Sequence, residues 1–282
     1  MPITPQELIA NLGDLPPLPQ VASQVLRVSA DPDANAEDLR KVISMDQALT
    51  SQILKISNSA MFGMMREVTT LTQAIMTLGF STIKSVVIAS SAKNLYHRGT
   101  VGLQERIIWE HALVSAIGAR AFAKSLRFPR VEEAFIGGLL HDIGKSVMGV
   151  KFPERYAALL RTVYNEQSGC LQLELDTFGF DHAMVGEALV NKWNLAASLQ
   201  AAVRWHHDPL HAPADHQELA AIVALANQMA LEEKVGIGDP HHLDDASTQA
   251  MSILQLGPEA LEGIKERVRD AIEQDKTMIT EF

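Results

Sequence analysis

The stretch Gly137-Gly138-Leu139-Leu140-His141-Asp142-Ile143-Gly144-Lys145 places a histidine and an aspartate side by side at the end of an apolar run. Its first two glycines allow a neighbouring helix to approach closely. His141 offers a ring nitrogen and Asp142 two carboxylate oxygens, which together suit a borderline divalent cation. Lys145 follows one turn later and can meet a phosphate as a point charge. On its own, the pair is more typical of a structural contact in which Asp142 caps or pairs with His141.

Four further histidines occupy helical positions elsewhere in the chain: His111, His182, His206 and His207. With the His141-Asp142 pair they make six candidate ligands on four helical segments, the arrangement that a metal site in a helix bundle requires. Each histidine also has a purely structural interpretation, as a satisfied core residue or as a residue near a helix end. Both interpretations of the set stay open.

Residues that typically start or end helices recur along the whole chain, and no segment shows the alternation of apolar and polar residues that is typical of a strand. The first helix is expected after the capping box at Thr4-Pro5-Gln6-Glu7. Further helices are predicted over 20–30, from Asn35 to Ile43, from Asp46 to Ile56, over 70–78, over 81–96, over 103–126, over 131–140, over 153–165, over 181–192, over 196–206, over 216–233 and over 257–276. Asn35 and Asp46 are expected to cap their helices, and Gly79 is expected to close the helix over 70–78. The sequence therefore predicts an all-α fold.

A polar break at His97-Arg98-Gly99-Thr100 interrupts this helical pattern. We take it as the seam between an N-terminal helical lobe, 1–98, and a second lobe, 99–282. The second lobe carries the whole net charge of −10, because eight basic and eight acidic residues cancel within 1–100. An acidic surface repels phosphate backbones, so the charge disfavours non-specific nucleic-acid binding.

The composition, with 47 % apolar and 21 % charged residues, is that of an ordinary globular chain. A single cysteine, Cys170, excludes a disulfide framework within the chain and suits a reducing cytoplasm. The N-terminal residues lack the features of a signal peptide, and no apolar run approaches the length of a membrane span. We therefore expect a cytoplasmic protein without a membrane partner.

Other chemistries have little support in the sequence. A Walker-type nucleotide site is disfavoured because the chain has no glycine-rich phosphate loop. Cys170 stands at a probable helix start, with no sign of an activating base, so it is a poor candidate for a nucleophile. The nucleophile elbow of serine hydrolases is absent as well.

Several motifs in order resemble the HDOD family, the HD-related output domain of bacterial signalling proteins. They are Leu15-Pro16-Pro17-Leu18-Pro19, Asp31-Pro32-Asp33, Asn58-Ser59-Ala60-Met61-Phe62-Gly63, Ala74-Ile75-Met76-Thr77-Leu78-Gly79, the HDIGK stretch and His206-His207-Asp208-Pro209. The resemblance covers about residues 12–210. It implies an all-helical, two-lobed bundle with an HD-like second lobe and a signalling role, often as the output of a phosphorelay and usually without established catalysis.

The HDOD family in turn resembles the HD and HD-GYP metal-dependent phosphohydrolases. By that resemblance His111 corresponds to a first histidine ligand, and His141 and Asp142 to the HD pair. His182, His206 and His207 correspond to ligands of a second metal ion, which would also keep Asp142. Lys145 corresponds to a lysine that faces the substrate phosphate. In an enzyme, Asp142 and Lys145 would be the catalytic pair.

Two departures from the pattern weaken the case for an enzyme. Asn227 stands where the closing aspartate of the HD pattern is expected, and a neutral amide oxygen is a weaker ligand than a carboxylate. No Gly-Tyr-Pro follows the double histidine, which disfavours hydrolysis of cyclic di-GMP.

The favoured function is a regulatory module with a divergent HD-type site for one or two ions of iron, manganese or zinc. It would bind a signalling partner, for example the receiver domain of a response regulator, or a small nucleotide. The rival hypothesis is a metal-dependent phosphohydrolase acting on a nucleotide or phosphoester, and a third is a purely structural site. Met61, Met64 and Met65 fit either an adaptable contact surface or, more simply, the core.

Overall fold

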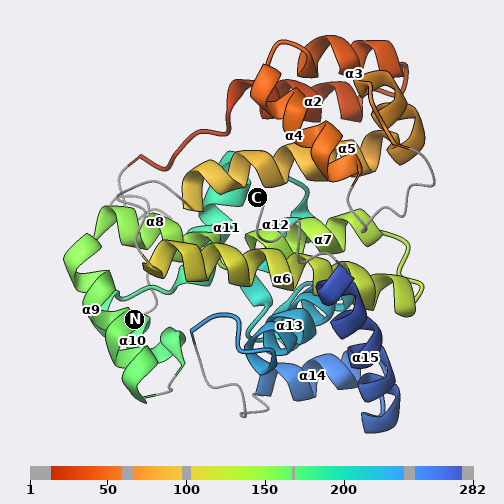
Figure 1. Cartoon of the computed structure of the whole chain (residues 1–282). Coiled ribbons are helices and arrows are strands. Elements are labelled where there is room, and N and C mark those ends of the chain that lie inside the picture. Colours follow the sequence, from red (N-terminus) through yellow and green to blue (C-terminus); the bar gives the residue numbers. More distant parts are fainter. Residues whose placement is uncertain (1–13, 59–66, 97–102, 167–168, 238–244, 275–282) are drawn as a thin grey trace. The chain divides into compact units, whose positions relative to one another are not determined.

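A computed structural model of the chain describes residues 14–58, 67–96, 103–166, 169–237 and 245–274 (Figure 1). Within these ranges every regular element is helical and no strand occurs, so the predicted all-α class is confirmed. The capping box at Thr4-Pro5-Gln6-Glu7, the seam at 97–100, and Met61, Met64 and Met65 lie outside the described residues.

The chain divides into two compact units. One unit comprises residues 1–17 and 95–269, and the other comprises 18–94 and 270–282. The division at 94/95 falls near the seam that the sequence suggests, but the first unit also takes in the N-terminal residues. The lobe boundaries of the sequence analysis stay a prediction.

The smaller unit contains α2 (Gln20–Ala30), α3 (Ala36–Ile43), α4 (Gln47–Ser57) and most of α5 (Leu71–Tyr96), and side-chain caps begin α3 and α4. The Asn35 side chain accepts the backbone N–H groups of the first turn of α3 and completes a capping box with Asp38. Asp46 accepts the N–H of Leu49 and caps α4. The predicted break at Gly79 is present as a non-helical residue with φ 77° inside α5.

Helix α5 departs from one expectation of the sequence analysis. Its segment Leu71–Lys93 is long and apolar enough to cross a membrane by length and composition alone, whereas no run of that kind was expected. Half of that window is buried inside the protein, and Gly79 interrupts its helical geometry. Both features are typical of a core helix, so the segment is weak evidence for a membrane span.

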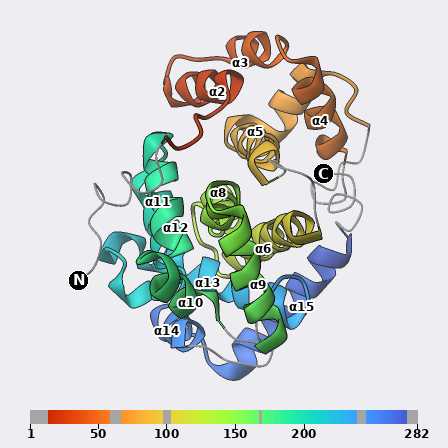
Figure 2. The same ribbon diagram turned by 90° about the vertical axis from the view of Figure 1, so that its left-hand side faces the viewer.

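The larger unit contains the remaining helices. They are α6 (Leu103–Ser125), α7 (Val131–Leu140), α8 (Ile143–Lys151), α9 (Pro153–Glu166), α10 (Cys170–Phe178), α11 (His182–Lys192), α12 (Ala197–Trp205), the short 3₁₀ turns η2 (Pro209–His211) and η3 (Ala214–His216), α13 (Gln217–Glu232), α14 (Asp245–Ile253) and most of α15 (Pro258–Gln274). Helix α13 is the centre of this unit: residues 219–230 are all buried, and α6, α7, α12 and α14 pack around it (Figure 2). A helix that is apolar all round belongs in a core.

The glycines of the segment 137–145 bring helices into close contact, as the sequence predicts. A Cβ on Gly138 would lie 2.6 Å from the carbonyl oxygen of Ser115 on α6. A Cβ on Gly144 would lie 1.9 Å from the carbonyl oxygen of His182, the first residue of α11. These two contacts hold the start of α8 against α11 and the end of α7 against α6.

Candidate metal centre

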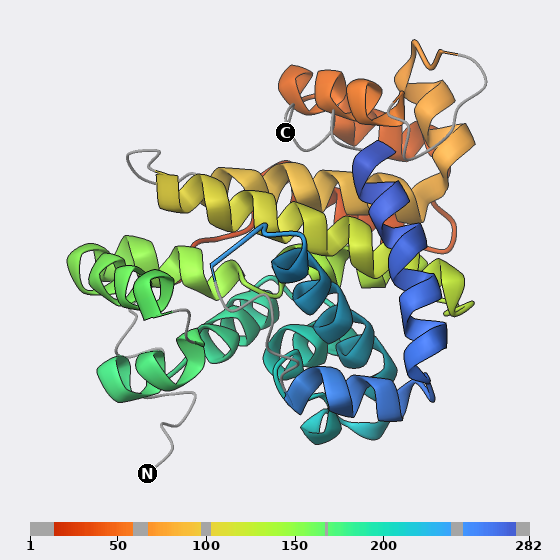
Figure 3. The same ribbon diagram turned by 60° about the horizontal axis from the view of Figure 1, so that its bottom comes forward.

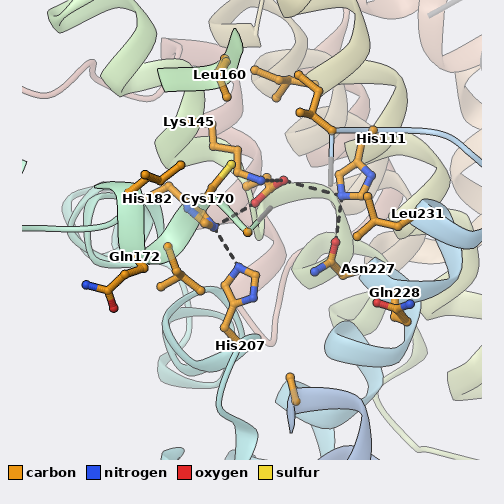
Figure 4. A pocket seen from close by; sticks show the side chains of 18 of the residues that line it. His111, Lys145, Leu160, Cys170, Gln172, His182, His207, Asn227, Gln228 and Leu231 are labelled. Atoms are coloured by element: carbon orange, nitrogen blue, oxygen red, sulfur yellow. Dashed lines mark hydrogen bonds and ion pairs between the residues drawn. The ribbon is translucent and has the colours of Figure 1, made fainter. Parts of the chain in front are cut away.

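The six predicted ligands come together in the larger unit, at the ends and middle of five helices. His111 lies within α6, His141 and Asp142 join α7 to α8, and His182 begins α11. His206 and His207 directly follow α12. His207 is half-buried, and the other five are buried. Figure 4 shows three of these histidines, His111, His182 and His207, around the same pocket as Lys145 and Asn227.

Asp142 is shared by two groups of ligand atoms. The four-residue position consists of Asp142, His182, His206 and His207, and the three-residue position consists of His111, His141 and Asp142. Within each group the ligand atoms lie within 4.8 Å of one another. Bonds of about 2.0–2.2 Å from a metal ion to nitrogen and oxygen ligands fit such a spacing. One carboxylate between two such groups is the arrangement of a bridging ligand.

The Nδ1 atoms of three histidines are held by backbone carbonyl oxygens outside the cluster. Those of His141 and His206 contact the carbonyl oxygens of Gly138 and Val203 at 2.7 and 2.8 Å. That of His111 contacts the Val235 carbonyl at 2.8 Å. A carbonyl oxygen only accepts, so each of these Nδ1 atoms must donate its proton. The neutral rings therefore present a bare Nε2 atom to the cluster.

The Nε2 atoms of the cluster face one another. Those of His111 and His141 are 3.3 Å apart, and those of His182 and His206 are 3.4 Å apart. Two unprotonated nitrogens cannot form a hydrogen bond, so each pair needs either a shared cation or a proton on one of its rings. Asp142 Oδ1 is likewise buried without a hydrogen-bond partner, 3.2 Å from His182 Nε2. The residues present thus fit a divalent metal ion in both positions.

Asn227 on α13 joins the three-residue position, as expected from its place in the sequence. Its Oδ1 atom lies 2.9 Å from His111 Nε2. Because His111 donates from Nδ1, both of these atoms have lone pairs to share with a cation. The amide brings no charge, so Asp142 stays the one carboxylate at this position.

Charge and burial set the protonation states of the cluster. Burial lowers the pKa of His111 to about 4, so its ring stays neutral at ordinary pH. Burial also acts against a charged His182, but the Glu174 carboxylate outweighs burial and raises the His182 pKa to about 9. For Asp142, burial opposes ionisation, yet His141 and Lys145 hold the pKa of the carboxyl well below its usual range.

These states predict that the two positions respond differently to pH. A metal ion at the four-residue position must displace the proton of His182, so its apparent affinity is expected to rise about tenfold per pH unit from about pH 6 to about pH 9. The three-residue position contains His111, which is already neutral, and its affinity is expected to stay flat over that range. Zn²⁺ titrations against a chelator at several pH values check this. Equal pH dependence of both binding steps would contradict it.

A pocket of about 750 Å³ opens beside the cluster. Asp142, Lys145, His182 and His207 line it together with Asn227, so a ligand in the pocket would reach both positions (Figure 4). Lys145 Nζ lies 2.7 Å from Asp142 Oδ2, and this leaves ammonium donors for a second acceptor. Cys170 also lines the pocket, but burial raises the pKa of its thiol to about 12, which keeps it protonated at neutral pH.

The sequence analysis missed two buried residues at the edge of the cluster. Glu174 of α10 accepts from His182, and Tyr156 of α9 donates to Glu174. The only signal in the sequence is that Glu174 lies one turn after Cys170, on the face that the short helix α10 buries. The sequence analysis also lacks helices α8 and α14; α8 directly follows the His141-Asp142 pair, and Asp142 makes no side-chain cap hydrogen bond.

An all-helical fold with a buried cluster of histidines around one aspartate defines a class of domain, and comparison with known proteins gives the family. The chain matches the HDOD domain over residues 15–209, which is more than half of its length. It therefore belongs to the HDOD domain family, as the motifs of the sequence predict.

Solved structures share the fold. An HDOD domain protein of unknown function from Geobacter sulfurreducens has a TM-score of 0.78 at 22% identity, covering 98% of this chain and 94% of that one. A Shewanella amazonensis SB2B protein described as a candidate phosphohydrolase has a TM-score of 0.78 at 24% identity over 97% of both chains. At these identities the similarity establishes the fold.

A curated relative is longer. An uncharacterized protein of Treponema pallidum (strain Nichols) is 29% identical over 220 residues, which make up 77% of this chain and 42% of that protein. The chain therefore spans less than half the length of this relative.

Proposed function

We propose that the chain is a regulatory domain that binds iron, manganese or zinc at the Asp142 cluster and a small phosphorylated ligand, such as a nucleotide, in the adjoining pocket. The observation that carries this proposal is the convergence of histidine Nε2 atoms, with pairs 3.3 and 3.4 Å apart, on one buried carboxylate that both groups of ligand atoms share. A signalling partner, for example a response-regulator receiver domain, would bind the liganded state of the domain.

The residues of the pocket support a phosphorylated ligand. Lys145 is buried with Asp142 and keeps its charge, because the Asp142 carboxylate outweighs the effect of burial and raises the lysine pKa. The remaining N–H groups of Lys145 can donate to an acceptor other than Asp142. A phosphoryl oxygen suits this role, because a hydrogen bond from an ammonium to an anionic oxygen is charge-assisted. Neutral amides of Asn227 and Gln228 on the pocket wall add donors for an uncharged part of the ligand.

Phosphoester hydrolysis is the second candidate function, and the pocket next to the cluster favours it. A bound metal ion would supply Lewis acidity toward a phosphoryl oxygen and would activate water. Asp142 would hold its place between the two positions, and Lys145 would stabilise negative charge on the phosphoryl group. The neutral Asn227 argues against this function, because it leaves the three-residue position with a single carboxylate.

Binding of phosphate compounds to metal-loaded protein tests the proposal. We expect calorimetry to detect at least one of inorganic phosphate, AMP, ATP or cyclic di-GMP, and expect Lys145→Gln to weaken that binding about tenfold, equivalent to about 1.4 kcal/mol. Lys151→Gln is the matched control, because Lys151 is exposed on the same helix and lies outside the pocket lining.

Two outcomes separate the alternatives. Binding that survives removal of the metal, or that is equal in Lys145→Gln and wild type, would contradict the proposed site. Release of inorganic phosphate from a bound ester, lost in Lys145→Gln, would favour the hydrolase over the regulatory domain.

A further inference from the structure

Glu174 is a fully buried carboxylate that contacts the candidate ligand His182 but belongs to neither group of ligand atoms. It lies on α10, and its side chain, like that of His182, has no exposed surface. Burying a carboxylate is costly unless it is paired and hydrogen-bonded. The contacts of Glu174 therefore indicate what it does.

Three donors converge on the two oxygens of Glu174. Oε2 accepts from the backbone N–H of His182 at 2.8 Å and contacts His182 Nδ1 at 2.7 Å. Oε1 accepts from the Tyr156 hydroxyl at 2.7 Å. One oxygen of the carboxylate thus contacts both the backbone N–H and the ring of His182. The hydroxyl of Tyr156, on the neighbouring helix, donates to the other oxygen.

This contact distinguishes His182 from the other histidines of the cluster. His111, His141 and His206 donate from Nδ1 to neutral backbone carbonyls. His182 instead faces a carboxylate, which makes its Nε2 atom a stronger donor to a cation. That Nε2 atom lies 3.2 Å from Asp142 Oδ1 and 3.1 Å from His207 Nε2, in the four-residue position.

We propose that Glu174 is a positioning residue for the four-residue position: it holds His182 as the Nδ1–H tautomer and directs Nε2 at the metal ion. This inference rests on the proposed metal binding and adds that the two positions have unequal support. The four-residue position has a carboxylate behind one of its histidines, and the three-residue position has only backbone carbonyls behind its histidines.

The same contact links the metal centre to the wall of the pocket. Helices α9 and α10 pack against each other (Figure 3), and Leu160 of α9 and the stretch 169–173 of α10 line the pocket. Glu174 follows that stretch directly, and Tyr156 lies one turn before Leu160. Displacement of the Glu174 carboxylate would therefore disturb both His182 and the α9–α10 side of the pocket.

Glu174→Gln tests this role with little change of volume. A glutamine keeps an oxygen for the two N–H groups of His182 and can turn its NH₂ group to the Tyr156 hydroxyl, so this variant removes the negative charge behind the ring and keeps the hydrogen bonds. We expect metal affinity at the four-residue position to fall about 10- to 100-fold, and affinity at the three-residue position to stay unchanged. The titrations are run against a chelator at about pH 9, so that competition from the His182 proton is small. Glu166→Gln is the control, because Glu166 lines the pocket but is exposed.

A purely structural role of Glu174 would give a different result. It would weaken both binding steps equally, together with a lower thermal midpoint of the metal-free protein, and this would overturn the proposal. Unchanged binding at both positions would also overturn it. Tyr156→Phe, which keeps the carboxylate, is expected to have a smaller effect than Glu174→Gln on the same step.

A second readout separates this inference from metal binding itself. Nitrogen NMR of the metal-free protein above the His182 pKa reports which ring nitrogen carries the proton. We expect an Nδ1–H ring at His182 in the wild type and an Nε2–H ring in Glu174→Met, which has no strong acceptor for Nδ1. If the wild type binds no metal but the His182 tautomer differs between the wild type and the variant, the proposed function fails and the role of Glu174 in positioning stands. If the tautomer is the same in both, the inference fails even where metal binds.

Discussion

Replacing Asp142 with asparagine is expected to remove metal ions from both positions at once. Asp142 is the ligand that the two groups share, and its two oxygens face different histidines: Oδ1 is 3.2 Å from His182 Nε2, and Oδ2 is 3.4 Å from His141 Nε2. Asparagine keeps the shape but supplies one neutral oxygen. Since removing even an outer-shell partner costs about 10- to 100-fold in metal affinity, loss of the bridging ligand is expected to exceed about 100-fold at each position.

Two variants give this prediction its controls. Asp245→Asn changes a carboxylate that lines the same pocket outside the cluster, and it is expected to leave both affinities unchanged. Asn227→Asp adds a carboxylate 2.9 Å from His111 Nε2, and it is expected to strengthen the three-residue position alone. Loss of only one binding step in Asp142→Asn would show that Asp142 does not bridge the two positions.

Gly144→Ala is expected to be the most disruptive substitution to the fold around the metal centre. Its Cβ would lie 1.9 Å from the His182 carbonyl oxygen, 2.8 Å from the His182 carbonyl carbon and 2.9 Å from Gly186 N. All three are backbone atoms, so no side-chain rotation relieves the clash, and α8 must move away from α11. We expect a loss of about 3 kcal/mol or more in the free energy of unfolding, measured by denaturant titration.

Gly149→Ala, on the same helix, is the matched control for this change. A Cβ at Gly149 meets only Tyr156 Cδ1, at an ordinary 3.8 Å. Because alanine favours a helix interior over glycine by up to about 1 kcal/mol, this variant is expected to be neutral or more stable than the wild type. Equal stabilities of the two variants would show that the close contact between α8 and α11 is not tight in solution.

Much of the fold follows from local signals in the sequence. Asn35 and Asp46 were recognised as helix caps and act as such, and Gly79 breaks α5 where glycine was expected to end a helix. Helix α8 was not predicted, because it begins immediately after His141-Asp142 and has no side-chain cap of its own. Its place is set by Gly144 packing on α11, a contact between distant residues that leaves no local pattern.

The sequence predicts which residues form the cluster but not the distances and contacts between them. Histidines at helix ends and within helices pointed to a bundle site, and the structure brings all six candidate ligands and Asn227 together. The resemblance to the HD proteins implies that Asp142 belongs to both groups, but spacing alone does not determine it, because it depends on how α7, α11 and α12 pack. Glu174 was invisible for the same reason, since its partners Tyr156 and His182 lie on two other helices.

Metal content per chain, measured by elemental mass spectrometry on protein purified without oxygen or chelators, tests the central claim most directly. The account predicts one or two equivalents of iron, manganese or zinc in the wild type, and less than about a tenth of that in Asp142→Asn at equal folded content. Wild-type protein that holds no metal after exposure to all three ions would contradict it. The cluster would then be a hydrogen-bonded structural core, with His182 charged between Glu174 and Asp142.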